Sequence, residues 1–456
     1  MGMGKRCESR QQELWISSGS VASAPGHAFY ERLNQLLAKA EFDRWIEKLC
    51  EPHYAETGRD SIPPGVYFRM LLIGYFEGIE SQRGIAWRCA DSLSLKRFLG
   101  YGLTESPPEH SSLTKIRERL PAELYVQVFQ FVLTLVAEHK LLSAKRVGVD
   151  STTLEANAAM KSIVRKETGE NWNEYVAGLM REEGLVEPDE TPSAEELRRF
   201  DKKRTGKKVS NDDWENPFDP DAKITKLKDG RTHLAYKAEH VVDLDSEVIL
   251  AAEIYPADVS DKTTLTDSVM TARCHVSEAG LSQLTIDAAA GDKGYHAREQ
   301  LALASCFSVR TYVAEPVRKY RSDWTKSPAE QQDAVYANRR RVKGARGRAL
   351  QRLRSEKVER SFAHLCETGG SRRSWLRGLA KVRKRYTIAA AARNLGLLMR
   401  KLFGMGKPRT QQPEGPPAGN GPQTPESFLR QLIRRLRVPF HAAFGPYEVG
   451  ECPIAA

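Results

Sequence analysis

The hydrophobic pattern of the chain changes at Arg146, and this change restricts the fold more than any other feature. Before Arg146, apolar residues recur at helical spacing, as in the segments 29–40 and 124–135. After it, short apolar runs such as residues 147–149 alternate with segments of helical period. Strands that alternate with helices are typical of α/β proteins. The sequence therefore predicts an all-helical N-terminal domain followed by an α/β domain.

Composition shifts divide the chain further. We expect a flexible leader over residues 1–25, a helical domain over 26–140 and an α/β domain over 141–405. Residues 160–230 are polar and rich in charge and turn signals, so they are expected to form a helical or irregular insertion in the α/β domain. Residues 406–456 begin with a Pro- and Gly-rich linker and end in a tail that contains a short basic helix over 428–436.

Individual elements can be placed within these regions. Helices are predicted over residues 29–40, 65–78, 110–120, 124–140, 263–279, 351–366 and 386–403. Ser111 or Ser112 is expected to cap the helix over 110–120. Strands are predicted over 147–149, ending at Asp150, and over 234–242, 248–254 and 284–286, with a hairpin turn at 243–246.

Several classes of protein are disfavoured. No apolar run reaches the roughly 18 residues that a membrane span needs. The first 25 residues lack the apolar core of a secretion signal, so we expect a cytoplasmic protein. The seven cysteines include no CxxC pair, which argues against a zinc site or a disulfide framework.

Positive charge is concentrated in two segments of a chain whose net charge is +11. Residues 339–360 hold ten basic side chains against two acidic ones, and residues 371–401 hold ten and no acid. Such clustering predicts a polyanionic partner, nucleic acid above all. The alternative is a solvated helix face, although such faces usually mix both signs.

The segment 110–120 is a short basic helix that follows two prolines. Lys115 and Arg117 on it would contact DNA if the helix belongs to a helix-turn-helix motif. A plain bundle helix with exposed basic residues explains the segment equally well.

Three acidic residues are candidates for phosphodiester chemistry. Two divalent ions roughly 4 Å apart can activate an attacking oxygen and stabilise a leaving one, and such ions prefer carboxylate ligands. Asp150 follows an apolar run, Asp292 lies in the segment Gly-Asp-Lys-Gly-Tyr, and Glu359 lies on the basic helix over 351–366. Each also has a plain structural explanation, as a turn residue or a surface ion pair, and spacing alone does not select these three from 59 acids.

The motifs around these acids resemble those of bacterial insertion-sequence transposases of the DDE type, in the IS4/IS5-like superfamily. The likeness runs from about residue 26 to 405 and includes Gly-Val-Asp-Ser-Thr at 148–152, Asp-Lys-Gly-Tyr at 292–295 and Val-Glu-Arg-Ser-Phe at 358–362. The resemblance implies a ribonuclease-H-like mixed sheet flanked by helices, with residues 160–230 inserted. It also implies that Asp150, Asp292 and Glu359 are catalytic and bind two Mg²⁺ ions, with Mn²⁺ as a substitute.

The third motif departs from the family pattern. Many relatives place an arginine four residues before the glutamate and a lysine seven after it, but Ser355 and Cys366 stand at these positions relative to Glu359. Glu356 is therefore an alternative third acid, and Glu359 is preferred for its closer motif. The resemblance further implies that Lys293 and Tyr295 contact the cleaved strand or brace the loop. The structural alternative is a solvated Lys293 and a Tyr295 packed in the core, and we favour it for the tyrosine. Other basic residues would replace the missing contacts, namely Arg354, Arg360, Arg372 and Arg373.

The expected activity is metal-dependent cleavage and strand transfer of insertion-sequence ends. The implied partner is double-stranded DNA, as terminal inverted repeats and as target, bound by a homodimer associated with the bacterial nucleoid. Two alternatives remain: a nuclease with the same core that performs no strand transfer, and a non-catalytic DNA-binding protein derived from a transposase.

Overall fold

The computed structural model describes residues 26–408, except for 56, 58–60, 188, 206–209, 228–229, 318–323 and 326. The predicted leader, nearly all of the predicted linker and the predicted helix over 428–436 lie outside these residues. The division of the chain into domains at residue 140 stays a prediction.

The N-terminal part is helical, as predicted. Pro63 and Pro64 start the third helix, and Gly78 ends it with a left-handed φ of 67°. The helix over 110–119 begins at His110 with Glu109 as its N-cap residue, so the predicted capping by Ser111 or Ser112 is wrong. Both serines instead lie inside the first turn. The helices are α1 (Ala28–Lys39), α2 (Phe42–Cys50), η1 (Glu51–His53), α3 (Pro64–Glu77), α4 (Gln82–Asp91), α5 (Leu93–Phe98), α6 (His110–Arg119) and α7 (Ala122–Glu138).

A mixed sheet follows the helices. Its central strand β1 (Arg146–Glu155) pairs antiparallel with β5 (Thr232–Asp243), which pairs antiparallel with β6 (Ile249–Pro256). On the other side of β1, β7 (Ala288–Gly291) and β8 (Arg310–Val313) run parallel to it. The short strand β4 (Lys223–Lys226) pairs with the start of β5. The mixed sheet implied by the sequence is thus confirmed: β1, β4, β5 and β6 are joined by antiparallel pairs, and β1, β7 and β8 by parallel ones.

Two strand predictions need correction. Asp150 does not follow β1 but lies within it, because pairing with β5 continues as far as Glu155. The predicted strand over 284–286 is also wrong, since β7 begins at Ala288. Its residues Ala288, Ala289 and Ala290 have a weak strand preference and are held in place by pairing with β1 and β8.

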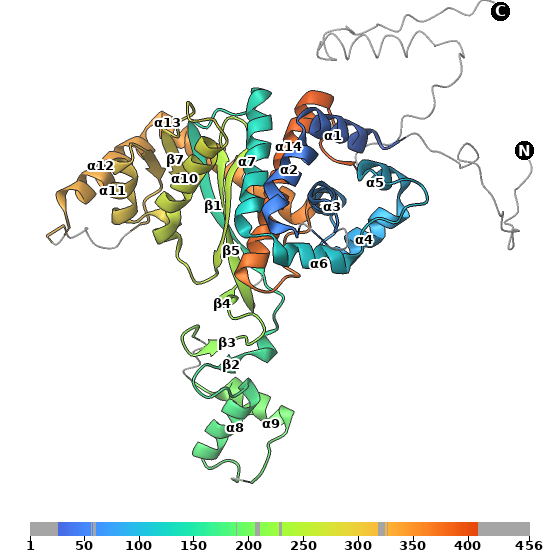
Figure 1. Ribbon diagram of the computed structural model, residues 1–456. Helices are drawn as coiled ribbons and strands as arrows, with labels where there is room; N and C mark the ends of the chain where they lie inside the picture. Colours follow the sequence, from blue (N-terminus) through green and yellow to red (C-terminus); the bar gives the residue numbers. More distant parts are fainter. Residues whose placement is uncertain are drawn as a thin grey trace, which may run out of the picture. The chain divides into compact units, whose positions relative to one another are not determined.

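Helices cover both faces of this sheet (Figure 1). The predicted helices over 263–279, 351–366 and 386–403 are present, whereas α11, α12 and β8 were not predicted. The helix that begins at Ala345 continues after Ala363 as one π-helical turn, η4 (His364–Thr368). The helices are α10 (Asp261–Glu278), η3 (Lys293–Tyr295), α11 (Arg298–Cys306), α12 (Ala329–Lys343), α13 (Ala345–Ala363) and α14 (Leu379–Phe403).

The insertion between β1 and β5 extends away from the sheet (Figure 1). Helices α8 (Trp172–Glu182) and α9 (Ala194–Lys203) each begin with a capping box and pack on each other through a small separate core. The insertion also contains η2 (Met160–Ser162) and the paired strands β2 (Val164–Arg165) and β3 (Trp214–Glu215). The segment between β1 and β5 thus contains two helices, a 3-10 turn and one pair of short strands.

Helix α14 joins the helical part of the chain to the sheet. It packs against α7 and α3 on one side and against β6 on the other. The Asn394 side chain accepts a hydrogen bond from Ile249 N at 2.9 Å and donates one to Ile249 O at 2.8 Å. Two of its lysines also bind backbone: Lys384 Nζ donates to Leu120 O, and Lys401 Nζ donates to His139 O at 3.1 Å. Part of the basic segment 371–401 thus stabilises the fold itself.

Among the described residues, no single helix has both the length and the apolar composition needed to span a membrane, and only the bent pair α6 and α7 would meet both criteria together. The five cysteines in the described ranges are free thiols.

Replacing Gly148 with alanine is expected to destabilise the protein by about 1–3 kcal/mol. A methyl group there would lie 2.8 Å from Leu244 Cδ2 and from Val358 Cγ2, so α13 could not keep its distance from β1. Urea unfolding of the variant measures the effect. Gly178→Ala is the matched control, because nothing lies within 4 Å of its added methyl group in α8 and alanine favours helix. Equal stability of the Gly148→Ala variant and the wild type would contradict this packing.

Candidate active site

The two candidate aspartates lie side by side on neighbouring strands. Gly148 of β1 is paired with Ala290 of β7 in parallel register. Continuing this register by two residues aligns Asp150 with Asp292, at the end of β7, on strands that are spaced about 4.8 Å apart. Carboxylates separated by 142 positions in the sequence therefore meet at one edge of the fold.

Asp150 is partly buried, and a cationic side chain lies beside it. Arg354 of α13 donates to Asp150 Oδ2 at 2.5 Å, and Ser151 N donates to Asp150 Oδ1 at 2.9 Å. Burial raises the pKa of Asp150, and the negative charge of Asp292 raises it further, while Arg354 and the Ser151 amide oppose the rise. Burial is the largest cause of the net upward shift of the pKa, and a partly buried carboxylate with a shifted pKa is typical of a functional site.

Asp292 starts the tight turn after β7. Its Oδ1 accepts a hydrogen bond from Gly294 N at 2.7 Å, which fixes the turn that becomes η3. Gly294 is required by space, because a Cβ there would lie 2.9 Å from Asp292 Oδ1 and 3.2 Å from Asp261 Oδ2. Lys293 is exposed at this turn and Tyr295 is fully buried, as the sequence suggested for the tyrosine.

Behind the aspartates lies a buried polar network that the sequence did not reveal. Glu239 of β5 is 1% exposed, and its carboxylate accepts hydrogen bonds from Tyr295 Oη at 2.9 Å and from Thr264 Oγ1 at 2.8 Å. Lys237 Nζ lies 3.4 Å from the same carboxylate and 3.0 Å from that of Asp261. This network connects β5 and α10 to the turn that carries Asp292.

Asp261, the first residue of α10, links the network to both candidate aspartates. Its Oδ1 accepts a hydrogen bond from Ser151 Oγ at 2.9 Å, and its other oxygen faces Gly294. Only its position directly after the strand pair that precedes α10 distinguishes it in the sequence. Asp261 is thus a neighbour of the site that sequence reasoning missed.

Helix α13 is fixed over β1 and β5 by apolar and polar contacts. Val358 packs on Gly148, and Phe362 stacks on the His240 ring with centroids 4.0 Å apart. The His240 nitrogens lie 2.7 Å from Ser361 Oγ and 2.8 Å from Tyr386 Oη. Complete burial lowers the pKa of His240 well below its usual value, so this histidine is a neutral structural link.

The two candidate glutamates occupy different faces of α13. Glu356 Oε1 accepts a hydrogen bond from Arg360 at 2.5 Å, and Arg360 also contacts Glu247 in the turn between β5 and β6. Residues four apart share a helix face, so Glu356 belongs with Arg360. Glu359 is exposed and accepts a hydrogen bond from Ser355 Oγ at 2.9 Å.

Helical geometry favours Glu359 over Glu356 as the glutamate nearer the aspartates. The β5–β6 turn lies at the start of β1, since Leu244 N donates to Arg146 O at 2.8 Å. Lys357 also reaches Glu247 there, at 3.1 Å. At 100° per residue, Glu359 lies on the opposite flank of α13, the flank directed along β1 toward Asp150.

The three acids are not gathered into a ready metal site. Within the described ranges, no group of three His, Cys, Asp or Glu side chains is close enough to hold a metal ion. The donors nevertheless suit Mg²⁺, because Asp150 and Asp292 offer adjacent carboxylates and no sulfur or imidazole. Arg354 supplies the positive charge beside Asp150 in this arrangement.

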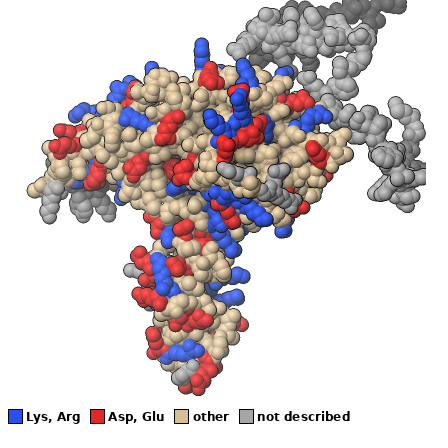
Figure 2. Space-filling view, in the orientation of Figure 1, with Lys and Arg blue, Asp and Glu red and all other residues tan. Residues whose placement is uncertain are grey.

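The other predicted DNA contacts are scattered. Arg372 is exposed near Glu367, and Arg373 lies against the ring of Trp375. Lys115 is exposed on α6, whereas Arg117 is 9% exposed and points into the protein. Figure 2 shows Lys and Arg side chains gathered around the position that α6 has in Figure 1, while both signs mix on the insertion.

Tyr295→Phe is expected to reduce the free energy of unfolding by about 1–3 kcal/mol, because the buried Glu239 carboxylate would lose a donor. Tyr255→Phe is the control, since its hydroxyl contacts Ser268 Oγ at 3.2 Å in a less buried place. Urea denaturation curves of both variants compare the losses. A larger loss for Tyr255→Phe would contradict the role given to the network.

Comparison with known families gives two matches. A family model described as a transposase domain (DUF772) matches residues 21–119, and one described as a transposase DDE domain matches residues 205–395. Together they cover more than half of the chain. The second match includes Asp292 and Glu359, while Asp150 precedes it. Searches of curated proteins and of solved structures found no match.

The mixed sheet, its flanking helices and the DDE match define a DDE-type transposase with a ribonuclease-H-like α/β fold. Since the matched N-terminal domain is also a transposase domain, the chain belongs to the insertion-sequence transposases of this class, which are DNA transposases and enzymes. Its place in the IS4/IS5-like superfamily stays a prediction.

Proposed function

We propose that this transposase cleaves double-stranded DNA at the terminal inverted repeats of its element and joins the freed 3′ ends to target DNA, with Asp150, Asp292 and Glu359 as catalytic residues. The observation that carries the proposal is the register of β1 and β7, which aligns Asp150 with Asp292. The position of Glu359 on the flank of α13 directed along β1 supports it as the third acid.

The three carboxylates would hold Mg²⁺, as two ions, with Mn²⁺ as a substitute. When bound, the metal supplies a Lewis acid that activates the attacking oxygen and offsets charge on the phosphate. Asp292 is positioned by the Gly294 amide, and Asp150 by the Ser151 amide. Arg354 compensates the charge of Asp150 at 2.5 Å, and its guanidinium is a donor that would suit a phosphate of the cleaved strand.

Exposed basic residues around the site would bind the DNA backbone. Lys293 follows Asp292 directly in the chain, and Arg360 is an exposed residue of α13 whose side chain pairs with Glu247 and Glu356. Arg372, Arg373 and, on α6, Lys115 are further exposed basic residues that would contact the DNA backbone. Because two element ends must be joined, the active form would be a homodimer on paired ends, in the cytoplasm and associated with the nucleoid.

Purified full-length protein tests the proposal with duplexes that carry the DNA flanking its gene. In Mg²⁺ we expect nicks at the repeat ends and, with target plasmid, joined products; neither forms in EDTA. Cleavage without joining would identify a nuclease, and tight DNA binding without Mg²⁺-dependent cleavage would identify a non-catalytic DNA-binding protein. Either result would overturn the proposed activity.

A further inference from the structure

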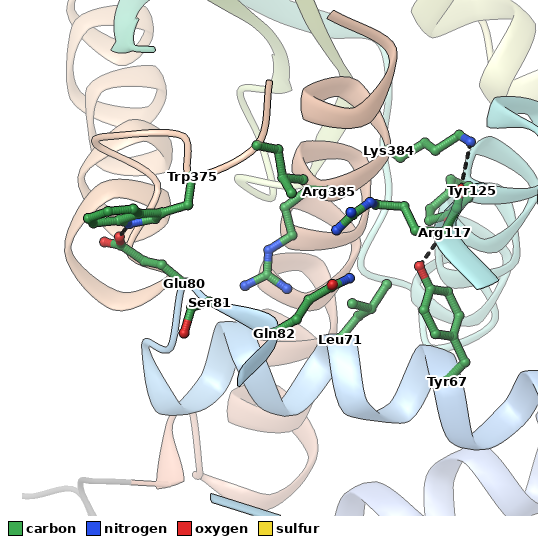
Figure 3. A pocket seen from close by; sticks show the side chains of 11 residues that line it. Tyr67, Leu71, Glu80, Ser81, Gln82, Arg117, Tyr125, Trp375, Lys384 and Arg385 are labelled. Atoms are coloured by element: carbon green, nitrogen blue, oxygen red, sulfur yellow. Dashed lines mark hydrogen bonds between the residues drawn. The ribbon is translucent and has the colours of Figure 1, made fainter. Parts of the chain in front are cut away.

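A cavity of about 210 Å³ lies apart from the carboxylates, between the N-terminal helices and α14. Its walls come from α3, α4, α6, α7, α14 and the segment that precedes α14. Figure 3 shows the guanidinium groups of Arg117 and Arg385 directed into the space between these walls. At this size the cavity is smaller than a typical site for a drug-sized ligand, so it suits a compact group.

The cavity carries an excess of positive charge. Arg117, Lys384 and Arg385 line it, against the single carboxylate of Glu80. Arg385 donates to Ile79 O at 2.8 Å, and burial lowers the pKa of its guanidinium to about 10. Positive groups this close together inside a protein favour an anion that would compensate them.

Arg117 is the strongest indication of a ligand. Its side chain is more than nine-tenths buried, and its Nε has no hydrogen-bond partner among the described residues. A buried guanidinium nitrogen without a hydrogen-bond partner is costly, and the planar set of donors of a guanidinium matches the oxygens of a phosphate. Lys384 cannot relieve it, because Lys384 is itself cationic and donates to the Arg117 and Leu120 carbonyls.

Neutral donors complete the site. The hydroxyls of Tyr67 and Tyr125 lie 2.7 Å apart, and since one donates to the other, one O–H is left for a ligand. Ser81 and Gln82 at the N terminus of α4 also line the cavity, and a helix N terminus favours negative charge. Glu80 is turned to the far wall, where the Trp375 indole donates to it (Figure 3).

We propose that this cavity binds a phosphate group of the DNA strand, with Arg117 and Arg385 as its principal ligands. The inference rests on the proposed function, because the DNA is that of the transposition reaction. The exposed Trp375 at the cavity wall, with Arg373 over its ring at 5.1 Å, offers a stacking surface for an adjoining base. Free inorganic phosphate shares this chemistry, so the test separates the two sources.

The first arm measures thermal unfolding of the full-length protein with sodium phosphate, against sodium chloride of equal ionic strength. Phosphate is expected to stabilise the wild type, and Arg117→Gln to weaken that binding at least about tenfold. Arg119→Gln is the matched control, because it removes the same charge from the same helix outside the cavity. Without phosphate, the unfolding temperature of Arg117→Gln should be no lower than that of the wild type, because the substitution removes an uncompensated charge. An unstabilised wild type would overturn the proposal.

The second arm measures DNA affinity by fluorescence anisotropy across a range of salt concentrations. Arg117→Gln is expected to lower the slope of log K against log salt by about one, the signature of one lost phosphate contact, and Arg119→Gln to lower it less. An unchanged slope with intact phosphate stabilisation would assign the cavity to free phosphate and overturn the DNA proposal. Cleavage by the wild type, scored in parallel, tests the proposed function separately, because neither arm requires cleavage.

Discussion

Asp292→Asn is expected to abolish Mg²⁺-dependent cleavage while leaving the fold and DNA binding intact. An asparagine Oδ1 can still accept the hydrogen bond from Gly294 N, so the turn after β7 keeps its conformation. What is lost is one of two adjacent negative charges that attract the metal. Losing several kcal/mol of transition-state stabilisation lowers the cleavage rate at least roughly a thousandfold.

The measurement is single-turnover cleavage of a labelled duplex carrying an element end, with binding followed by anisotropy. Asp287→Asn is the matched control, because it makes the same change just before β7, at the other end of the strand. The Asp287 carboxylate accepts a hydrogen bond from the nearby Thr285 Oγ1 at 3.0 Å. Cleavage at the wild-type rate by Asp292→Asn would remove this residue from the site. A simultaneous loss of DNA binding would point to misfolding, which circular dichroism detects.

Glu359→Gln and Glu356→Gln are expected to differ sharply. Glu359→Gln keeps the acceptor for Ser355 Oγ but removes the charge, so cleavage should fall by at least roughly a hundredfold. Glu356→Gln breaks only an exposed pair with Arg360, worth about 0.3–0.5 kcal/mol of stability, and should cut normally.

Single-turnover cleavage of both variants, with their unfolding curves, decides between the two registers of the third motif. The reverse result would assign the third carboxylate to Glu356 and require α13 to rotate on binding DNA. Normal cleavage by both variants would place the third ligand elsewhere, and Asp261 would then be the nearest remaining acid to examine.

Local sequence patterns predicted most of the framework. The spacing of apolar residues, together with the turn residues, predicts the hairpin of β5 and β6 and the helices α3, α7 and α10. In contrast, β7 is a run of alanines whose extended form depends on β1 and β8, which come from distant segments. Pairing also extended β1 beyond Asp150 through polar residues that look like a turn.

The site was predictable only in part for a related reason. Motifs marked Asp150, Asp292 and Glu359, but register alone aligns the first two, and register is a property of the folded sheet. The network around Glu239 has no local signature, because its partners come from β5, α10 and η3. Arg117 looked like an exposed residue of a basic helix, and only the packing of α6 against α14 turned it inward.

Helix α14 has a consequence for how the chain is made. It is the last described element, yet it covers β6, α7 and α3, and Asn394 satisfies the backbone of Ile249 from 145 positions away. When the sheet strands have been synthesised, the helix that completes their core has still to be made. The nascent enzyme therefore cannot complete its core until α14 has been synthesised, and a stop codon before residue 379 would leave apolar surface uncovered on both halves at once.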